Sequence, residues 1–206
     1  MNKLEYLKKL YGYLKNPNRD SLKLSMRDTH HKGVFSLVIS GTEFGRLTRV
    51  FIANKKIKPF KVQLHNHRYP LRITVIKGEI THHLANYLSE SSFGSISLSE
   101  FSYTSPLNGG NGLKYNKEVI INIQSHLLPI GSTIDLAQSD IHTMSCSKGS
   151  IWIVEELGFA SESSTVLGVP FTLDGLYKEA KPFQINDNIQ LVAKEIKKLT
   201  LHYELV

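Results

Sequence analysis

The middle of this 206-residue sequence consists of short segments rich in valine, isoleucine, phenylalanine and threonine, separated by glycine, proline, asparagine and serine. Segments of this length and composition are typical of β-strands, and the residues between them favour tight turns. The expected strands are 34–39, 47–52, 60–64, 72–76, 80–87, 119–123, 130–136, a segment around 144, and 151–154. So many short strands in succession predict an all-β protein whose antiparallel strands close into a barrel or pack as a sandwich.

Two amphipathic segments flank the strands and are predicted to be α-helices. Over about residues 2–15, apolar side chains recur at the three- and four-residue spacing of one helix face. The same spacing recurs over about residues 187–200. We expect both helices to close the ends of the β-structure, although helices that bind a partner show the same pattern. The sequence thus predicts one domain over 1–206, with a barrel core at about 34–157.

Composition sets further bounds on the class of protein. With 41% hydrophobic and 21% charged residues, the chain matches ordinary globular proteins, and no apolar run reaches the roughly 20 residues of a membrane-spanning helix. The first residues lack the regions of a signal peptide. Because Cys146 is the one cysteine, an intrachain disulfide and a cysteine-based zinc site are excluded. We therefore expect a cytoplasmic protein without membrane association.

Positive charge is concentrated at the start of the chain. Residues 1–60 contain thirteen lysines and arginines against four acidic residues, whereas the whole chain has a net charge of +7. Such asymmetry can mark a surface that binds nucleic acid or another anion. No run exceeds two adjacent basic residues, and no recognition-helix pattern accompanies them. A solvated basic face is therefore the favoured interpretation, and nucleic-acid binding is disfavoured.

The spacing of three histidines predicts a metal site. His65 and His67 end a strand-like segment at positions i and i+2, so their side chains leave the same face of a strand. Two neutral imidazoles from one strand can converge on one transition metal. A useful open site needs at least a third protein ligand. The best candidate is His142, which begins another strand-like segment after a polar turn at 138–140.

These histidines lie in segments that resemble the two motifs of the cupin superfamily. The stretch HNH at 65–67, followed by Arg72 and Gly78, is similar to the first motif, which is HxH, three or four residues, Glu, six residues and Gly. The stretch AQSDIH at 137–142 resembles the second motif, PxGxxH. The resemblance covers about residues 45–157. It implies a cupin-like jelly roll, which is an antiparallel β-barrel. The predicted N- and C-terminal α-helices flank this barrel and fall outside the resemblance.

The resemblance also implies a metal held by His65, His67 and His142. The glutamate ligand of the family falls at Arg72. A site of three neutral histidines leaves the full +2 charge on the metal, which favours an anionic ligand or substrate. Thiol dioxygenases of the superfamily are similar in binding ferrous iron with three histidines and no glutamate. In that reading Arg72 is a catalytic residue that pairs with a substrate carboxylate.

Three further residues are candidates for supporting roles. His82 and His83 follow the glycine of the first motif, and strand alternation turns one of them inward, as a fourth ligand or as a partner of a ligand. Cys146 lies four residues after His142 and is expected on the same face. It is read as a small buried apolar residue, with a redox-active neighbour of the metal as the alternative.

Together these features predict a cupin-fold metalloprotein. The first hypothesis is a mononuclear non-haem iron dioxygenase, an oxidoreductase acting on a small anionic molecule. Fe(II) is favoured, with Zn, Ni or Mn as alternatives, and a Lewis-acid mechanism fits the same site. The second hypothesis is a non-enzymatic ligand-binding or scaffold cupin, because Arg72 replaces a glutamate. The third is a basic binder of anions or nucleic acid. The expected partner is a small molecule, and the resemblance adds a possible homodimer.

Overall fold

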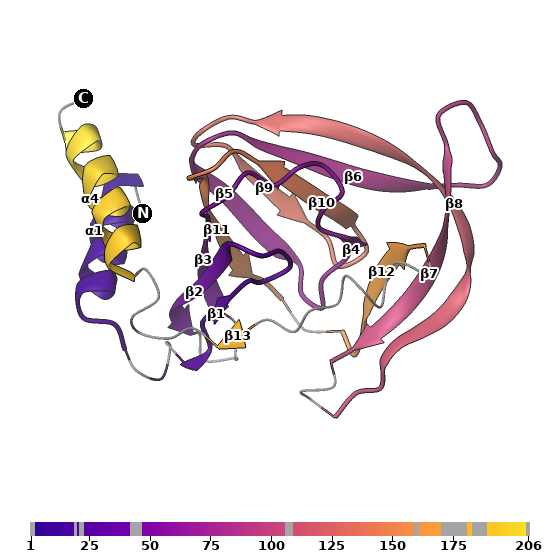
Figure 1. The fold of residues 1–206 in the computed structure, drawn as a ribbon, viewed down its shortest axis with the longest axis horizontal. Coiled ribbons are helices and arrows are strands. Elements are labelled where there is room, and N and C mark those ends of the chain that lie inside the picture. The colour runs from indigo at the N-terminus through magenta and orange to yellow at the C-terminus, as the bar shows by residue number, and fades with distance from the viewer. Residues whose placement is uncertain are drawn as a thin grey trace.

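The computed structural model describes residues 3–18, 20, 23–41, 47–105, 109–158, 161–169, 181–182 and 189–204. Its strands are antiparallel and form two layers, and two helices stand at one side of them (Figure 1). The predicted mostly-β architecture with helices at both ends is therefore confirmed. Within these residues, no helix has the length and apolar character needed to cross a membrane.

One layer is a sheet that contains seven strands among the described residues. Its order is β13-β1-β2-β3-β11-β5-β9. The strands are β1 (Met26–Arg27), β2 (Val34–Gly41), β3 (Leu47–Ala53), β5 (Leu71–Lys77), β9 (Thr133–Leu136), β11 (Ile151–Glu156) and β13 (Lys181–Pro182). Because β3 and β5 both pair with β11, strands distant in sequence are neighbours at the centre of the sheet.

The other layer is a ring of six strands in the order β10-β4-β12-β7-β8-β6, closed by pairing between β6 and β10. The strands are β4 (Leu64–His65), β6 (Ile80–Leu88), β7 (Ile96–Thr104), β8 (Gly112–Leu128), β10 (Ile141–Cys146) and β12 (Ser164–Gly168). The long strand β8 pairs with β6 along one part and with β7 along another. It therefore sweeps from beside the seven-stranded sheet to the far side of the ring (Figure 1).

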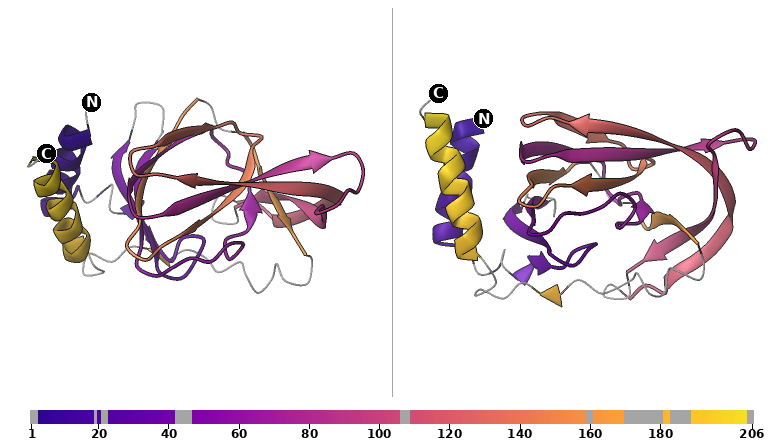
Figure 2. Two further views of the ribbon diagram at one scale, coloured as in Figure 1. Left: turned by 90° about the horizontal axis from the view of Figure 1, so that it is seen from above. Right: turned by 45° about the horizontal axis from the view of Figure 1, so that its top comes forward.

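The helices cover the outer face of the seven-stranded sheet. Helix α1 (Lys3–Lys15) packs against α4 (Ile189–Glu204), and both lie on the same side of the molecule (Figure 2). Fully buried side chains from both helices, including Leu7 and Ile196, join an apolar cluster with Leu37 and Val50 of the sheet. The apolar faces of both predicted helices thus pack against one face of the sheet, as expected for helices that close the β-structure.

A second apolar cluster lies between the two layers. It contains Phe51 and Trp152 from the seven-stranded sheet, stacked with ring centroids 5.4 Å apart, and Ile80 and Cys146 from the ring. Side chains alternate along a strand, so this cluster fixes which face of each layer is the inner one. His142 shares the inner face of β10 with Cys146, four residues away.

The sequence prediction differs from the structure at several strands. The expected strand 60–64 is reduced to β4 at Leu64–His65, because Phe60 has a φ of 59° and lies in a turn. Strands β1, β7, β12 and β13 are absent from the prediction. In β7, serine and glutamate residues dilute the apolar alternation. Strand β12 also lies beyond residue 157, where the barrel core was expected to end. The single-domain organisation stays a prediction.

Gly78 forms the turn between β5 and β6. Its φ is +85°, a conformation that residues with a side chain rarely adopt. A Cβ atom at this position would lie 2.3 Å from Ser150 Oγ and 2.8 Å from Ser150 Cα. Any larger residue at position 78 is therefore disfavoured for two reasons, backbone strain and lack of space for a Cβ atom.

We predict that Gly78→Ala destabilises the protein more than Gly94→Ala. Gly94 has a similar φ of +80°, but a Cβ there would meet nothing within 4 Å. The control should cost about 1 kcal/mol of backbone strain, and Gly78→Ala about 1–3 kcal/mol more through overpacking. Urea denaturation of both variants measures the difference, and equal losses would contradict the steric account.

Candidate metal centre

Pairing of β4 with β10 brings the three predicted histidines together. His65 and His142 are directly opposite each other in this pair, although they are far apart in the sequence. His67 follows two residues after His65 and turns to the same side. One ring nitrogen from each of the three lies within 4.8 Å of those of the other two. The structure therefore gathers His65, His67 and His142 into one cluster.

The rings of the cluster are in direct contact. Nε2 of His67 lies 2.9 Å from Nε2 of His142. The ring centroids are 4.7 Å apart for His65 and His67, 5.4 Å for His65 and His142, and 5.1 Å for His67 and His142. His142 is buried, whereas His65 and His67 are partly exposed. The cluster thus extends from the inner layer toward the solvent.

The hydrogen bond of His65 fixes which of its nitrogens is free. Nδ1 lies 2.7 Å from the carbonyl oxygen of Gln63, and a carbonyl can only accept, so Nδ1 carries the proton. The neutral ring then has a bare lone pair at Nε2. This atom is buried and has no hydrogen-bond partner among the described residues. An unpaired acceptor of this kind, beside two further imidazoles, is suited to a cation.

Electrostatics keep the three rings neutral. Burial lowers the pKa of His65, and it lowers the pKa of His67 and of His142 well below the ordinary value. Repulsion from the other imidazoles is the next cause for His67 and His142. Neutral imidazole is the form that binds a metal. None of the three imidazoles therefore has to lose a proton and its positive charge before the cluster can bind a divalent ion.

His82 and His83 take separate places although they are adjacent. Nε2 of His82 lies 3.0 Å from Nδ1 of His142, and both residues are buried. His83 instead contacts Ser125 Oγ at 2.7 Å and Ser145 Oγ at 3.0 Å. Burial lowers the pKa of His82 to about 4. His82 is thus the one that turns toward the cluster, where it touches a candidate ligand.

His30 adds a ring that the sequence analysis did not anticipate. It stacks on His65 with centroids 4.9 Å apart and an interplanar angle of 26°. His30 is exposed and has a φ of 60°. The turn that contains it lies against the ring of His65. Its sequence neighbourhood has no strand periodicity. Only the three-dimensional packing of this turn places it beside the cluster.

The structure does not bring Arg72 to the histidines. Its side chain is on the opposite face of β5 from Leu71 and Ile73, which are buried. It forms a bidentate ion pair with Asp135 of the neighbouring strand, at 2.8 and 2.9 Å. Both partners are well exposed. Arg72 therefore has a surface ion pair, as arginines in strands often do, and its role toward a substrate stays a prediction.

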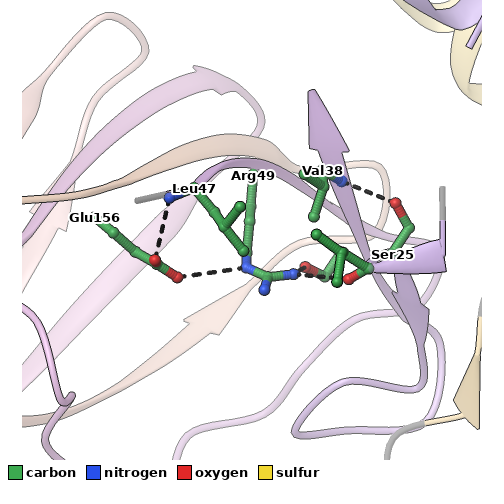
Figure 3. Close-up of polar contacts among 7 residues, drawn as sticks. Ser25, Val38, Leu47, Arg49 and Glu156 are labelled. Carbon is green, nitrogen blue, oxygen red and sulfur yellow. Dashed lines mark hydrogen bonds and ion pairs between the residues drawn. The ribbon is translucent and has the colours of Figure 1, made fainter. Parts of the chain in front are cut away.

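Another arginine, which the sequence analysis did not single out, lies on the inner face. Arg49 shares the face of β3 with Phe51 and forms an ion pair with Glu156, with Nε 3.7 Å from Oε1 (Figure 3). It also donates to the carbonyl of Leu24 at 3.1 Å and to Ser36 Oγ at 3.3 Å. The sequence does contain a signal for this position, because Arg49 lies two residues before Phe51 and therefore shares its face of the strand.

Cys146 lies in the apolar core and not in the histidine cluster. It is 7% exposed and lies in the apolar cluster between the layers, where burial raises the pKa of its thiol to about 11. The thiolate is the form that binds metals and reacts. Its position fits the predicted small buried residue. Among the described residues, it is not part of the group whose ligand atoms converge.

The fold and the cluster together define a class, a cupin-like jelly roll with three histidines that could hold a metal. No protein-family model matches this sequence, and no curated protein matches it. Solved structures are similar at low identity. Hydroxypropylphosphonic acid epoxidase from S. wedmorenis matches 65% of this chain at 14% identity with a TM-score of 0.41. The match covers 54% of that enzyme's chain, about half its length.

Two further structures are similar to this chain. Hydroquinone 1,2-dioxygenase PnpCD, in complex with Cd²⁺ and 4-hydroxybenzonitrile, matches 59% of this chain and 62% of its own at 12% identity, with a TM-score of 0.34. The Drosophila melanogaster CENP-C cupin domain matches 76% of this chain and 100% of its own at 13% identity, with a TM-score of 0.36.

We predict that Arg49→Met destabilises the protein by about 2–4 kcal/mol at pH 7, because it leaves the partly buried Glu156 without its counter-ion. Burial already raises the pKa of Glu156, so its ionised form is costly without Arg49. The loss should therefore shrink as the pH falls and Glu156 is protonated. Urea denaturation at pH 7 and pH 4.5 measures both effects. Arg72→Met is the control and should cause little change, since its ion pair is exposed.

Proposed function

We propose that this protein is a mononuclear metalloprotein in which His65, His67 and His142 bind a divalent transition metal. The observation that carries the proposal is the buried Nε2 lone pair of His65, which has no partner among the described residues and lies beside two neutral imidazoles. An unpaired buried polar atom is costly unless something binds to it. A metal ion satisfies all three rings at once.

The spacing of the rings supports this assignment. Two imidazole nitrogens bound to one ion, at about 2.0–2.1 Å each, lie no more than about 4.2 Å apart. The Nε2 atoms of His67 and His142 are 2.9 Å apart, within this limit. Without a metal, one proton lies between them, and a bound ion would take its place. Three protein ligands leave open positions on the ion for other molecules.

We propose Fe(II) as the ion, with Zn, Ni or Mn as alternatives, and dioxygenation of a small anionic molecule as the reaction. Bound ferrous iron would supply the activation of O₂. Three neutral ligands leave the +2 charge uncompensated, which favours an anionic substrate. On the protein side, the burial of His142 would keep water from one side of a bound ion, while the partly exposed His65 and His67 would leave access from the other.

We predict that the purified protein binds one Fe(II) per chain under anaerobic conditions, and that His67→Ala lowers the affinity at least about 100-fold. Loss of an outer partner of a ligand typically costs 10–100-fold, so loss of a ligand should exceed that. Isothermal titration calorimetry and elemental analysis measure the binding. His202→Ala, on the exposed side of α4, is the control and should bind normally. Wild-type protein that binds no metal would falsify the proposal.

The enzymatic part of the proposal has its own measurement. The Fe(II)-loaded protein should consume O₂ in step with a small anionic substrate, chosen from a panel of thiols and hydroxylated carboxylates. His142→Ala should abolish this consumption, because the buried ligand is lost. If the protein binds Fe(II) but consumes no O₂ with any member of the panel, the dioxygenase hypothesis is wrong and the ligand-binding or scaffold alternative stands.

A further inference from the structure

We propose that His82 is a positioning residue for the metal ligand His142: it accepts a hydrogen bond from Nδ1–H of His142 and thereby leaves Nε2 of that ring free for the metal. The inference rests on the proposed metal site and adds to it a residue outside the ligand set. The main observation behind the inference is the distance of 3.0 Å between His82 Nε2 and His142 Nδ1.

Neighbouring strands hold the two rings in this arrangement. β6 and β10 are paired, with Met144 opposite His82 and Leu84 opposite His142, so the two histidines are diagonal neighbours on one face. Their ring centroids are 5.0 Å apart. His82 is 5% exposed and His142 is 3% exposed. Water therefore has little access to this contact, and the strand pairing leaves the rings little freedom to separate.

The protons of the pair can be assigned from the requirements of a metal. A neutral imidazole carries one proton, and a metal at Nε2 of His142 requires that proton to be at Nδ1. Nδ1–H then points at Nε2 of His82, which must be the bare acceptor, with the proton of His82 on its own Nδ1. The partner thus selects the tautomer that the metal needs. Metal-binding histidines commonly use carboxylates or carbonyls for this purpose.

The same geometry argues against His82 as a fourth ligand. Its Nε2 faces Nδ1 of His142, which is the side of that ring turned away from His67. Among the described residues, the group whose ligand atoms converge consists of His65, His67 and His142 and does not include His82. His82 therefore acts through His142 and does not contact the ion.

The test uses two substitutions at His82 and one matched control. His82→Leu keeps apolar bulk but removes the acceptor, whereas the side-chain oxygen of His82→Gln can still accept from Nδ1–H. His83→Gln is the control, because His83 lies in the same strand, is equally buried at 5%, and bonds to serines and not to the cluster. The probe is Co²⁺, whose affinity is measured by competition with a chelator and whose visible d–d absorption reports the ligand geometry.

We expect His82→Leu to lower Co²⁺ affinity about 10–100-fold and to change the d–d spectrum, because the ring of His142 loses its orientation. His82→Gln should restore the affinity to within about threefold of the wild type, and His83→Gln should not differ from the wild type. Circular dichroism melting confirms that each variant is folded. If His82→Leu does not fold, the comparison of His82→Gln with the wild type still decides, since its amide must preserve both affinity and spectrum.

The outcomes separate this inference from the proposed function. Wild-type protein that fails to bind Co²⁺ overturns the metal site itself. A wild type that binds Co²⁺, with His82→Leu binding equally well and with an unchanged spectrum, overturns only the role of His82. A folded His82→Gln variant that loses affinity also contradicts it, because the acceptor has then been kept without effect.

Discussion

The arrangement of this molecule depends on the pairing of β4 with β10. β4 contains only two residues, yet it pairs with β10 on one side and with β12 on the other. This double pairing sets His65 directly opposite His142, and the ring of His67, two residues further on and outside the strand, lies beside both. A shift of one residue in the register would send these rings to the opposite face and leave no cluster.

The candidate centre combines two environments. At the inner end, His142 and His82 are buried beneath strand pairs, where water is excluded and their contact is held in one geometry. At the outer end, His65 and His67 are partly exposed and His30 closes over His65. A binding site needs both conditions, rigidity behind the ligands and access in front of them.

Most of the fold could be predicted from the sequence, because alternating β-branched residues and helical stripes report directly on local structure. The cluster was predictable for the same reason, since the i, i+2 spacing of His65 and His67 states which face they share. The positions of Arg72 and His30 could not be read in this way. Arg72 depends on which face of β5 meets the other layer, and His30 depends on the path of a turn without periodicity. Both are set by tertiary packing.

The strands that hold His65 come from distant parts of the chain. Its partner in β12, Val166, lies about a hundred residues further on, and closing such a loop carries an entropic cost before any contact rewards it. During synthesis, β4 can therefore complete its pairing only after β12 has been made, and His65 is held between β10 and β12 only then. Loading of a metal at the proposed site would then follow the synthesis of β12.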